Sequence, residues 1–150
     1  MRLRPFVTPR LVFLDLDVES REALLEFLAA RMSEECGDLD PDVLRGALLE
    51  RESLGGTAIG NGVAIPHARL PMRCESFVGF ARLSQPVEFE TPDDEPVRLV
   101  AFCSVDAKRA GQHLRILARL SRVLGDPANR EALKNAQTPQ DVIDILVQDD

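Results

Sequence analysis

The pattern of apolar and polar residues along the chain predicts both strands and helices. Residues 11–16, 76–83 and 97–105 are rich in apolar and β-favouring side chains, which is typical of strands. The last of these runs is almost continuously apolar, as expected for a strand at the centre of a sheet that is covered on both faces. Residues 85–90 indicate a short edge strand, because Pro86 cannot donate a hydrogen bond to a neighbouring strand.

Five segments have apolar residues at helical spacing. The first covers about residues 20–31, and the second begins at Asp40–Pro41, where aspartate caps the free amides and proline tolerates the first helical position. Three helices complete the chain, and the last two begin at Asp126–Pro127 and Thr138–Pro139. The order β-α-α-β-β-β-α-α-α predicts an α/β fold, layered α/β/α with a central mixed β-sheet flanked by helices.

Composition and charge narrow the class of protein. The 150 residues contain no repeat and no Gly/Ser linker, so we expect one domain over residues 1–150. The formal net charge of -7 disfavours non-specific binding to DNA or RNA, whose phosphates would repel the protein. No apolar run approaches the ~20 residues of a membrane helix, and the N-terminus lacks the pattern of a signal peptide. We therefore expect a cytoplasmic protein.

The cysteines fit the same expectation. Cys36, Cys74 and Cys103 are odd in number, scattered, and form no CxxC pair. Such a distribution predicts no disulfide framework and favours a reducing compartment.

The glycine-rich segment 55–62, GGTAIGNG, is the first candidate for chemistry. Gly55 and Gly60 have the separation found in a phosphate-binding loop, but Asn61 occupies the position of the lysine that such a loop needs. A dinucleotide-binding fingerprint would lack its third glycine here. The segment therefore indicates either a tight connection that needs positive φ or a close approach to an anionic group.

The two histidines, His67 and His113, are the other candidates. Position alone is compatible with a structural role for both, because His67 follows a short apolar run and His113 lies near the start of a helix. Neither belongs to a cluster of cysteine and acidic residues with the spacing of a metal site. We therefore expect no metal ion and no cofactor.

One stretch of sequence has a family resemblance. Residues 51–67, RESLGGTAIGNGVAIPH, resemble the signature of the enzyme IIA domains of the bacterial phosphotransferase system, in the fructose/mannitol-type and nitrogen-regulatory branch. Residues 113–120, HLRILARL, resemble the second block of that family, which carries a second histidine. The resemblance spans roughly residues 5–147.

The sequence departs from this family pattern at three positions. Gly56 stands where serine is usual, which removes a hydroxyl group. Ala58 replaces a usual glycine, and Ala68 stands where glycine often follows the histidine, so each adds a methyl group that restricts the backbone. All three departures leave His67 in place. We therefore expect them to adjust the properties of the site without removing its candidate nucleophile.

The resemblance implies that His67 accepts a phosphoryl group. A neutral imidazole nitrogen is nucleophilic near pH 7. By the same resemblance, Arg51 binds phosphoryl oxygens with its planar guanidinium, and His113 supports the reaction. The implied donor is a histidine-containing phosphocarrier protein, and the implied acceptor is a IIB domain or a regulatory target protein. Neither nucleic acid nor insertion into a membrane is implied.

The sequence is compatible with three roles for this protein. We expect a phosphotransferase that resembles the nitrogen-regulatory members and signals by its phosphorylation state. A sugar-specific IIA component of a fructose/mannitol-type permease is the close alternative. The third is a protein-interaction module without phosphoryl transfer, because the cytoplasmic domain of anion exchangers is similar in fold.

Overall fold

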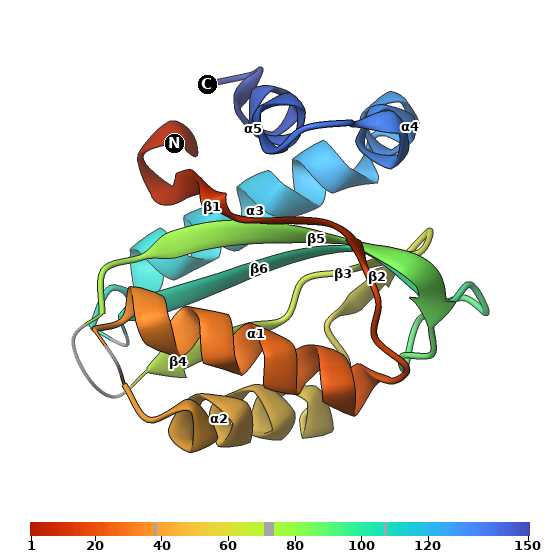
Figure 1. Ribbon diagram of the computed structural model, residues 1–150. Helices are drawn as coiled ribbons and strands as arrows, with labels where there is room; N and C mark the ends of the chain where they lie inside the picture. Colours follow the sequence, from red (N-terminus) through yellow and green to blue (C-terminus); the bar gives the residue numbers. More distant parts are fainter. Residues whose placement is uncertain (38, 71–73, 107) are drawn as a thin grey trace.

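The computed structural model describes residues 1–37, 39–70, 74–106 and 108–150. In this part of the chain, one mixed sheet of six strands is flanked by five α-helices (Figure 1). In chain order the elements are the short 3₁₀ helix η1 (Arg4–Phe6), β1 (Val7–Leu16), α1 (Arg21–Glu35), α2 (Pro41–Ser53), β2 (Ala58–Gly60), β3 (Val63–Ala64), β4 (His67–Leu70), β5 (Phe77–Val87), β6 (Val97–Asp106), α3 (Ala110–Gly125), α4 (Pro127–Asn135) and α5 (Pro139–Val147).

The sheet has the strand order β1–β5–β6–β3–β2, and β4 also pairs with β6. Strand β5 runs antiparallel to β6, whereas β1 is parallel to β5 and both β3 and β4 are parallel to β6. Helices α1 and α2 cover one face of the sheet, and α3, α4 and α5 cover the other (Figure 1). The predicted α/β/α layering with a central mixed sheet is confirmed.

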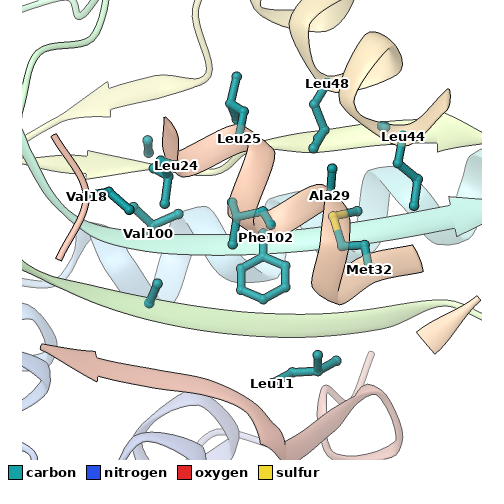
Figure 2. Packing of buried hydrophobic residues seen from close by; sticks show 14 of the residues in the cluster. Leu11, Val18, Leu24, Leu25, Ala29, Met32, Leu44, Leu48, Val100 and Phe102 are labelled. Atoms are coloured by element: carbon teal, nitrogen blue, oxygen red, sulfur yellow. The ribbon is translucent and has the colours of Figure 1, made fainter. Parts of the chain in front are cut away.

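Each face of the sheet has its own apolar cluster. On the first face, Leu24 and Met32 of α1 and Leu44 and Leu48 of α2 pack against Phe102 of β6 and its neighbours (Figure 2). The second face is covered by buried residues of the last three helices, among them Ile116, Leu120, Leu133, Val142 and Leu146. Burying one such side chain contributes roughly 1.5–3 kcal/mol to stability. Strand β6 supplies residues to both clusters, as its unbroken apolar run predicts.

Helices α1, α2, α4 and α5 begin where the sequence predicts them. The side chains of Ser20, Asp40 and Asp126 accept hydrogen bonds from backbone amides in the first turns of α1, α2 and α4. Thr138 and Asp141 form a reciprocal capping box at the start of α5. Among the helices of the described residues, none is both long and apolar enough to cross a membrane.

The edge strand predicted around Pro86 is wrong. Gln85, Pro86 and Val87 continue β5, which lies between β1 and β6 inside the sheet. The register between β5 and β6 shifts between Arg82 and Val87, so the ladder is interrupted where proline occurs. This irregularity lets an inner strand contain a residue that cannot donate a hydrogen bond.

The absence of disulfides predicted from the cysteines is also wrong. A disulfide joins Cys36, which caps the end of α1, to Cys74, which precedes β5. The two residues are 38 positions apart, and only the packing of α1 on the sheet brings them together. Cys103 is the free cysteine of the described residues, and it is buried.

We expect reduction of the Cys36–Cys74 disulfide to lower the free energy of unfolding by about 2–4 kcal/mol, because opening a loop of this length frees the unfolded chain. Urea denaturation with and without a dithiol reductant measures the difference. A Cys36→Ser, Cys74→Ser variant is the control, since its stability should not respond to the reductant. Identical curves for the oxidised and reduced wild-type protein would contradict the prediction.

Candidate functional site

His67, which follows the short apolar run noted in the sequence, is the first residue of β4. It lies opposite Cys103 of β6 in a parallel pairing, and the backbone N–H of Cys103 donates to the carbonyl of Pro66. The side chain of His67 is only 8% exposed. The imidazole is therefore held at the edge of the sheet by a strand that itself has a fixed register.

The two ring nitrogens of His67 have different partners. Nδ1 lies 2.8 Å from the carbonyl oxygen of Ile65, which can only accept a hydrogen bond. Nε2 lies 3.2 Å from Nε of Arg51, which can only donate. Both contacts are satisfied by one tautomer, in which Nδ1 carries the proton and Nε2 carries the lone pair. The nitrogen of His67 that carries the lone pair therefore faces Arg51.

Arg51 belongs to the last turn of α2 and is half-buried. Besides its contact with His67, its Nη1 donates to the carbonyl of Gly55 at 2.6 Å. The turn after α2 thus holds the guanidinium beside the imidazole, although the two residues are 16 positions apart. The hydrogen bonds found among the described residues use Nε and Nη1, which leaves Nη2 for a further acceptor.

His113 lies in the first turn of α3 and is 7% exposed. Its ring centroid is 5.1 Å from that of His67, with an angle of 53° between the ring planes. Nδ1 of His113 is buried and has no hydrogen-bond partner within the described part of the chain. The fold therefore brings together all three residues proposed from the sequence.

Both histidines are neutral at pH 7. Burial, the largest effect, lowers the pKa of His67, and the positive charge of Arg51 lowers it further, while the bond to Ile65 and the charge of Glu52 act in the opposite direction. Burial also lowers the pKa of His113 to about 4, and the positive charges of His67 in its protonated form, Arg69 and Arg51 add to the shift. By contrast, burial raises the pKa of the Cys103 thiol to about 12, so this thiol is not an alternative nucleophile.

These shifts predict how stability depends on pH. In the unfolded chain a histidine binds a proton below about pH 6.5, whereas folded His113 does so only below about 4. The unfolded state therefore binds more protons in this interval, and the free energy of unfolding should decrease as the pH falls from 6.5 toward 4. Urea denaturation across this range measures the slope, and His113→Gln should make it shallower. An unchanged slope in that variant would contradict the prediction.

The glycine-rich segment forms a hairpin between β2 and β3, and this is the tight connection with positive φ that the sequence predicts. Asn61 and Gly62 form its turn, with φ values of 58° and 76°, and the Asp93 carboxylate accepts a hydrogen bond from the N–H of Asn61. Such a turn favours an Asn-Gly pair, because both residues need positive φ. The hairpin sets the position of β3, two residues before β4 begins.

The three departures from the family pattern fit this structure. A Cβ atom on Gly56 would lie 2.5 Å from the backbone oxygen of Glu90, so the chain leaves no room for serine there unless Glu90 moves. Ala58 and Ala68 lie in β2 and β4 and have no positive φ, so their methyl groups impose no strain on the backbone.

Glu52 is a member of the site that was not singled out from the sequence. It is only 2% exposed, and its carboxylate accepts hydrogen bonds from both the N–H and the hydroxyl of Thr57. The Arg-Glu pair at positions 51 and 52 could have drawn attention to Glu52. Its partner, Thr57, is visible only in the folded chain. Within the described residues, no group of three or more His, Cys, Asp or Glu side chains is arranged to hold a metal ion.

Comparisons with known proteins agree with the sequence resemblance. The family model described as "Phosphoenolpyruvate-dependent sugar phosphotransferase system, EIIA 2" matches residues 5–149. A nitrogen regulatory protein of Bradyrhizobium diazoefficiens is 37% identical over 146 residues, covering 97% of this chain and 95% of that protein. The fructose-specific EIIA component of Haloferax volcanii is 35% identical over 144 residues, covering 95% and 93%.

The solved structures agree as well. The crystal structure of nitrogen regulatory protein IIA-Ntr from Neisseria meningitidis superimposes with a TM-score of 0.89 at 31% identity, covering 95% of this chain and 97% of that one. The match of the family model runs through His67, Arg51 and His113 and spans nearly the whole chain. The chain therefore belongs to the EIIA type 2 family of the phosphoenolpyruvate-dependent sugar phosphotransferase system.

Proposed function

We propose that this protein is a phosphocarrier that accepts a phosphoryl group on Nε2 of His67 from a histidine-containing phosphocarrier protein. The observation that carries the proposal is the hydrogen bond from Nδ1–H of His67 to the carbonyl of Ile65. It leaves the lone pair on Nε2, and the lowered pKa keeps that nitrogen unprotonated at neutral pH. A single phosphocarrier domain over residues 1–150 is part of the proposal.

In the transfer step, Nε2 of His67 attacks the phosphorus atom of the donor's phosphohistidine. The new N–P bond forms as the donor's N–P bond breaks, and the electron pair of that bond returns to the donor imidazole, which carries a proton on its other ring nitrogen and therefore leaves as a neutral ring. The attacking ring becomes cationic and keeps its proton on Nδ1, where the Ile65 carbonyl stabilises it. Catalysis of this kind depends on positioning and on charge stabilisation rather than on a separate acid or base.

Arg51 and His113 have distinct proposed roles. Arg51 neutralises the negative charge of the phosphoryl oxygens by donating hydrogen bonds from its Nη2 and Nε. The Nε–H of Arg51 becomes available when the lone pair of His67 Nε2, its acceptor in the free protein, forms the bond to phosphorus. His113 donates a hydrogen bond from its neutral ring to another phosphoryl oxygen, which supplies the partner that its buried Nδ1 lacks among the described residues. The incoming group carries nearly two negative charges at neutral pH.

The partners are proposed to be proteins rather than small substrates. Leu54, directly after α2, is 78% exposed, and Leu114, next to His113, is 66% exposed. Large apolar side chains exposed beside polar site residues are typical of protein–protein contact surfaces. We propose that the phosphorylated carrier docks here in the cytoplasm, and that a IIB domain or a regulatory target uses the same surface afterwards.

We favour a regulatory role in which the phosphorylation state of His67 is the signal. The Bradyrhizobium and Neisseria relatives, which carry nitrogen-regulatory names, support this choice. The fructose-specific Haloferax relative supports the alternative of a sugar-transport component. Transfer from the phosphorylated protein to a fructose- or mannitol-type IIB domain would favour the transport role, and failure to transfer would favour the regulatory one.

Incubation with phosphoenolpyruvate and the general phosphotransferase proteins tests the proposal. We expect the intact mass to increase by one phosphoryl group, in a form that is labile to acid and stable to base. Omitting the histidine-containing phosphocarrier should prevent the increase. An unchanged mass in the complete mixture would contradict the proposal and favour an interaction module.

We expect His113→Ala to remain phosphorylated but to transfer its group more slowly, because His67 keeps its nucleophilic nitrogen and only one hydrogen bond to the phosphoryl group is lost. A hydrogen bond to a charged group is typically worth about 1.5–3 kcal/mol, so the rate should fall roughly 10- to 150-fold. Rapid-quench transfer from the phosphocarrier measures this rate. Peptide mapping that found the phosphoryl group on His113 in the wild-type protein would reverse the two roles.

A further inference from the structure

Glu52 is a carboxylate in the last turn of α2 with almost no exposed surface. Removing a charged carboxylate from water is unfavourable unless hydrogen bonds replace its solvation. Here Thr57, which is also buried, supplies two of them: its N–H donates to one carboxylate oxygen at 3.2 Å and its hydroxyl donates to the other. An apolar residue would fill this space without the unfavourable desolvation. Packing alone therefore does not explain why the carboxylate of Glu52 is buried here.

One path of hydrogen bonds runs from this pair to the imidazole of His67. The carbonyl of Thr57 accepts from the N–H of Ile65 at 3.0 Å. The carbonyl of Ile65 in turn accepts from Nδ1–H of His67 at 2.8 Å. The position of Thr57 therefore determines where the carbonyl oxygen of Ile65 lies, and this oxygen selects the tautomer of the His67 imidazole.

A second path runs from the same pair to Arg51. The two bonds between Glu52 and Thr57 close the turn that follows α2, and inside this turn the N–H of Gly55 donates to the carbonyl of Glu52. The carbonyl of Gly55 accepts from Nη1 of Arg51, whose Nε donates to His67. The next residue, Gly56, is pressed against the backbone of Glu90, so the turn has no room to shift on that side.

We propose that Glu52 and Thr57 form a positioning pair for phosphoryl transfer, which sets the orientation of both His67 and Arg51 through these two paths. The inference rests on the proposed phosphocarrier function. Neither residue touches the reacting atoms. The pair holds the nucleophile and the guanidinium at a fixed separation, and the negative charge of Glu52 favours the cationic ring that forms when Nε2 attacks. The same charge opposes the lowering of the His67 pKa.

Glu52→Gln and Thr57→Val test the proposal, with Glu50→Gln as the matched control, because Glu50 is an exposed carboxylate on the same helix. Transfer from the phosphorylated histidine-containing phosphocarrier gives kcat and KM. We expect both test variants to lower kcat, by about 10²-fold if the reacting groups are displaced by about 1 Å, with KM near the wild-type value. Thr57→Ser, which keeps the hydroxyl, and Glu50→Gln should retain wild-type kcat.

An NMR titration of His67 in the unphosphorylated protein supplies a readout that a purely structural role would not change. Glu52→Gln should lower the His67 pKa below the wild-type value, because it removes a negative charge that favours the cation. Wild-type kcat and wild-type His67 pKa in folded Glu52→Gln would overturn the proposal, as would a loss of stability alone. If Glu52→Gln does not fold, wild-type kcat in Thr57→Val overturns it.

The titration also separates the inference from the proposed function. If wild-type protein accepts no phosphoryl group, the phosphocarrier assignment fails, and with it the catalytic part of this inference. The shift in the His67 pKa, measured without any donor, then still decides whether Glu52 acts on the histidine.

Discussion

Phosphorylation should disappear completely when His67 is replaced by alanine, while the domain stays folded. Within the described site, Nε2 of His67 is the one candidate nucleophile that meets two conditions. It carries an unprotonated lone pair, and it lies beside a cation, Arg51. The neighbouring thiol of Cys103 is buried and protonated, and His113 has no bond that selects its tautomer among the described residues. Labelling with phosphoenolpyruvate and the general phosphotransferase proteins measures the effect.

His113→Ala is the matched control for this experiment, because it removes the other buried imidazole of the pair and should still be labelled. Circular dichroism and urea denaturation check that both variants fold. Undiminished labelling of folded His67→Ala would contradict the assignment of the acceptor residue.

Replacing Arg51 should slow phosphoryl transfer in both directions. Accepting a phosphoryl group adds negative charge to a chain whose net charge is already -7, and Arg51 is the cation that touches the nucleophilic nitrogen. Losing a charge-assisted contact costs about 1.5–3 kcal/mol, which corresponds to roughly 10- to 150-fold in rate. Arg51→Lys should recover only part of this loss, since an ammonium group cannot contact two oxygens in the geometry of a guanidinium.

Arg45→Ala provides the control for Arg51→Ala. Arg45 is an exposed arginine of the same helix, paired with Asp42 at 3.6 Å, and its removal changes the charge equally. Transfer rates of Arg45→Ala should equal those of the wild type. If Arg51→Ala also transfers at the wild-type rate in both directions, Arg51 has no role in stabilising the phosphoryl group.

Local sequence signals predicted much of the fold because they act over a few residues. Proline after a capping residue marks the starts of α2, α4 and α5, and the unbroken apolar run marks β6 as the strand with both faces covered. The short strands were missed because two to four residues carry no periodicity. The Asn61–Gly62 pair was nevertheless a hairpin signal that the surrounding glycines obscured.

Features that depend on distant segments were not visible in the sequence. Cys36 and Cys74 meet only because α1 packs on the sheet, and spacing alone does not indicate which cysteines pair. For the site, the family signature identified His67, Arg51 and His113, and the fold brings them into contact. The role of Glu52 required the structure, since nothing in the sequence indicates that Thr57 turns back to meet its carboxylate.

A ¹⁵N and ³¹P NMR spectrum of the phosphorylated protein identifies directly which nitrogen carries the phosphoryl group. We predict phosphorylation of His67 at Nε2, with the proton retained on Nδ1, because the Ile65 carbonyl holds that proton in the free protein. A phosphoryl group on Nδ1 of His67, or on either nitrogen of His113, would contradict the assignment of Nε2 of His67 as the acceptor atom.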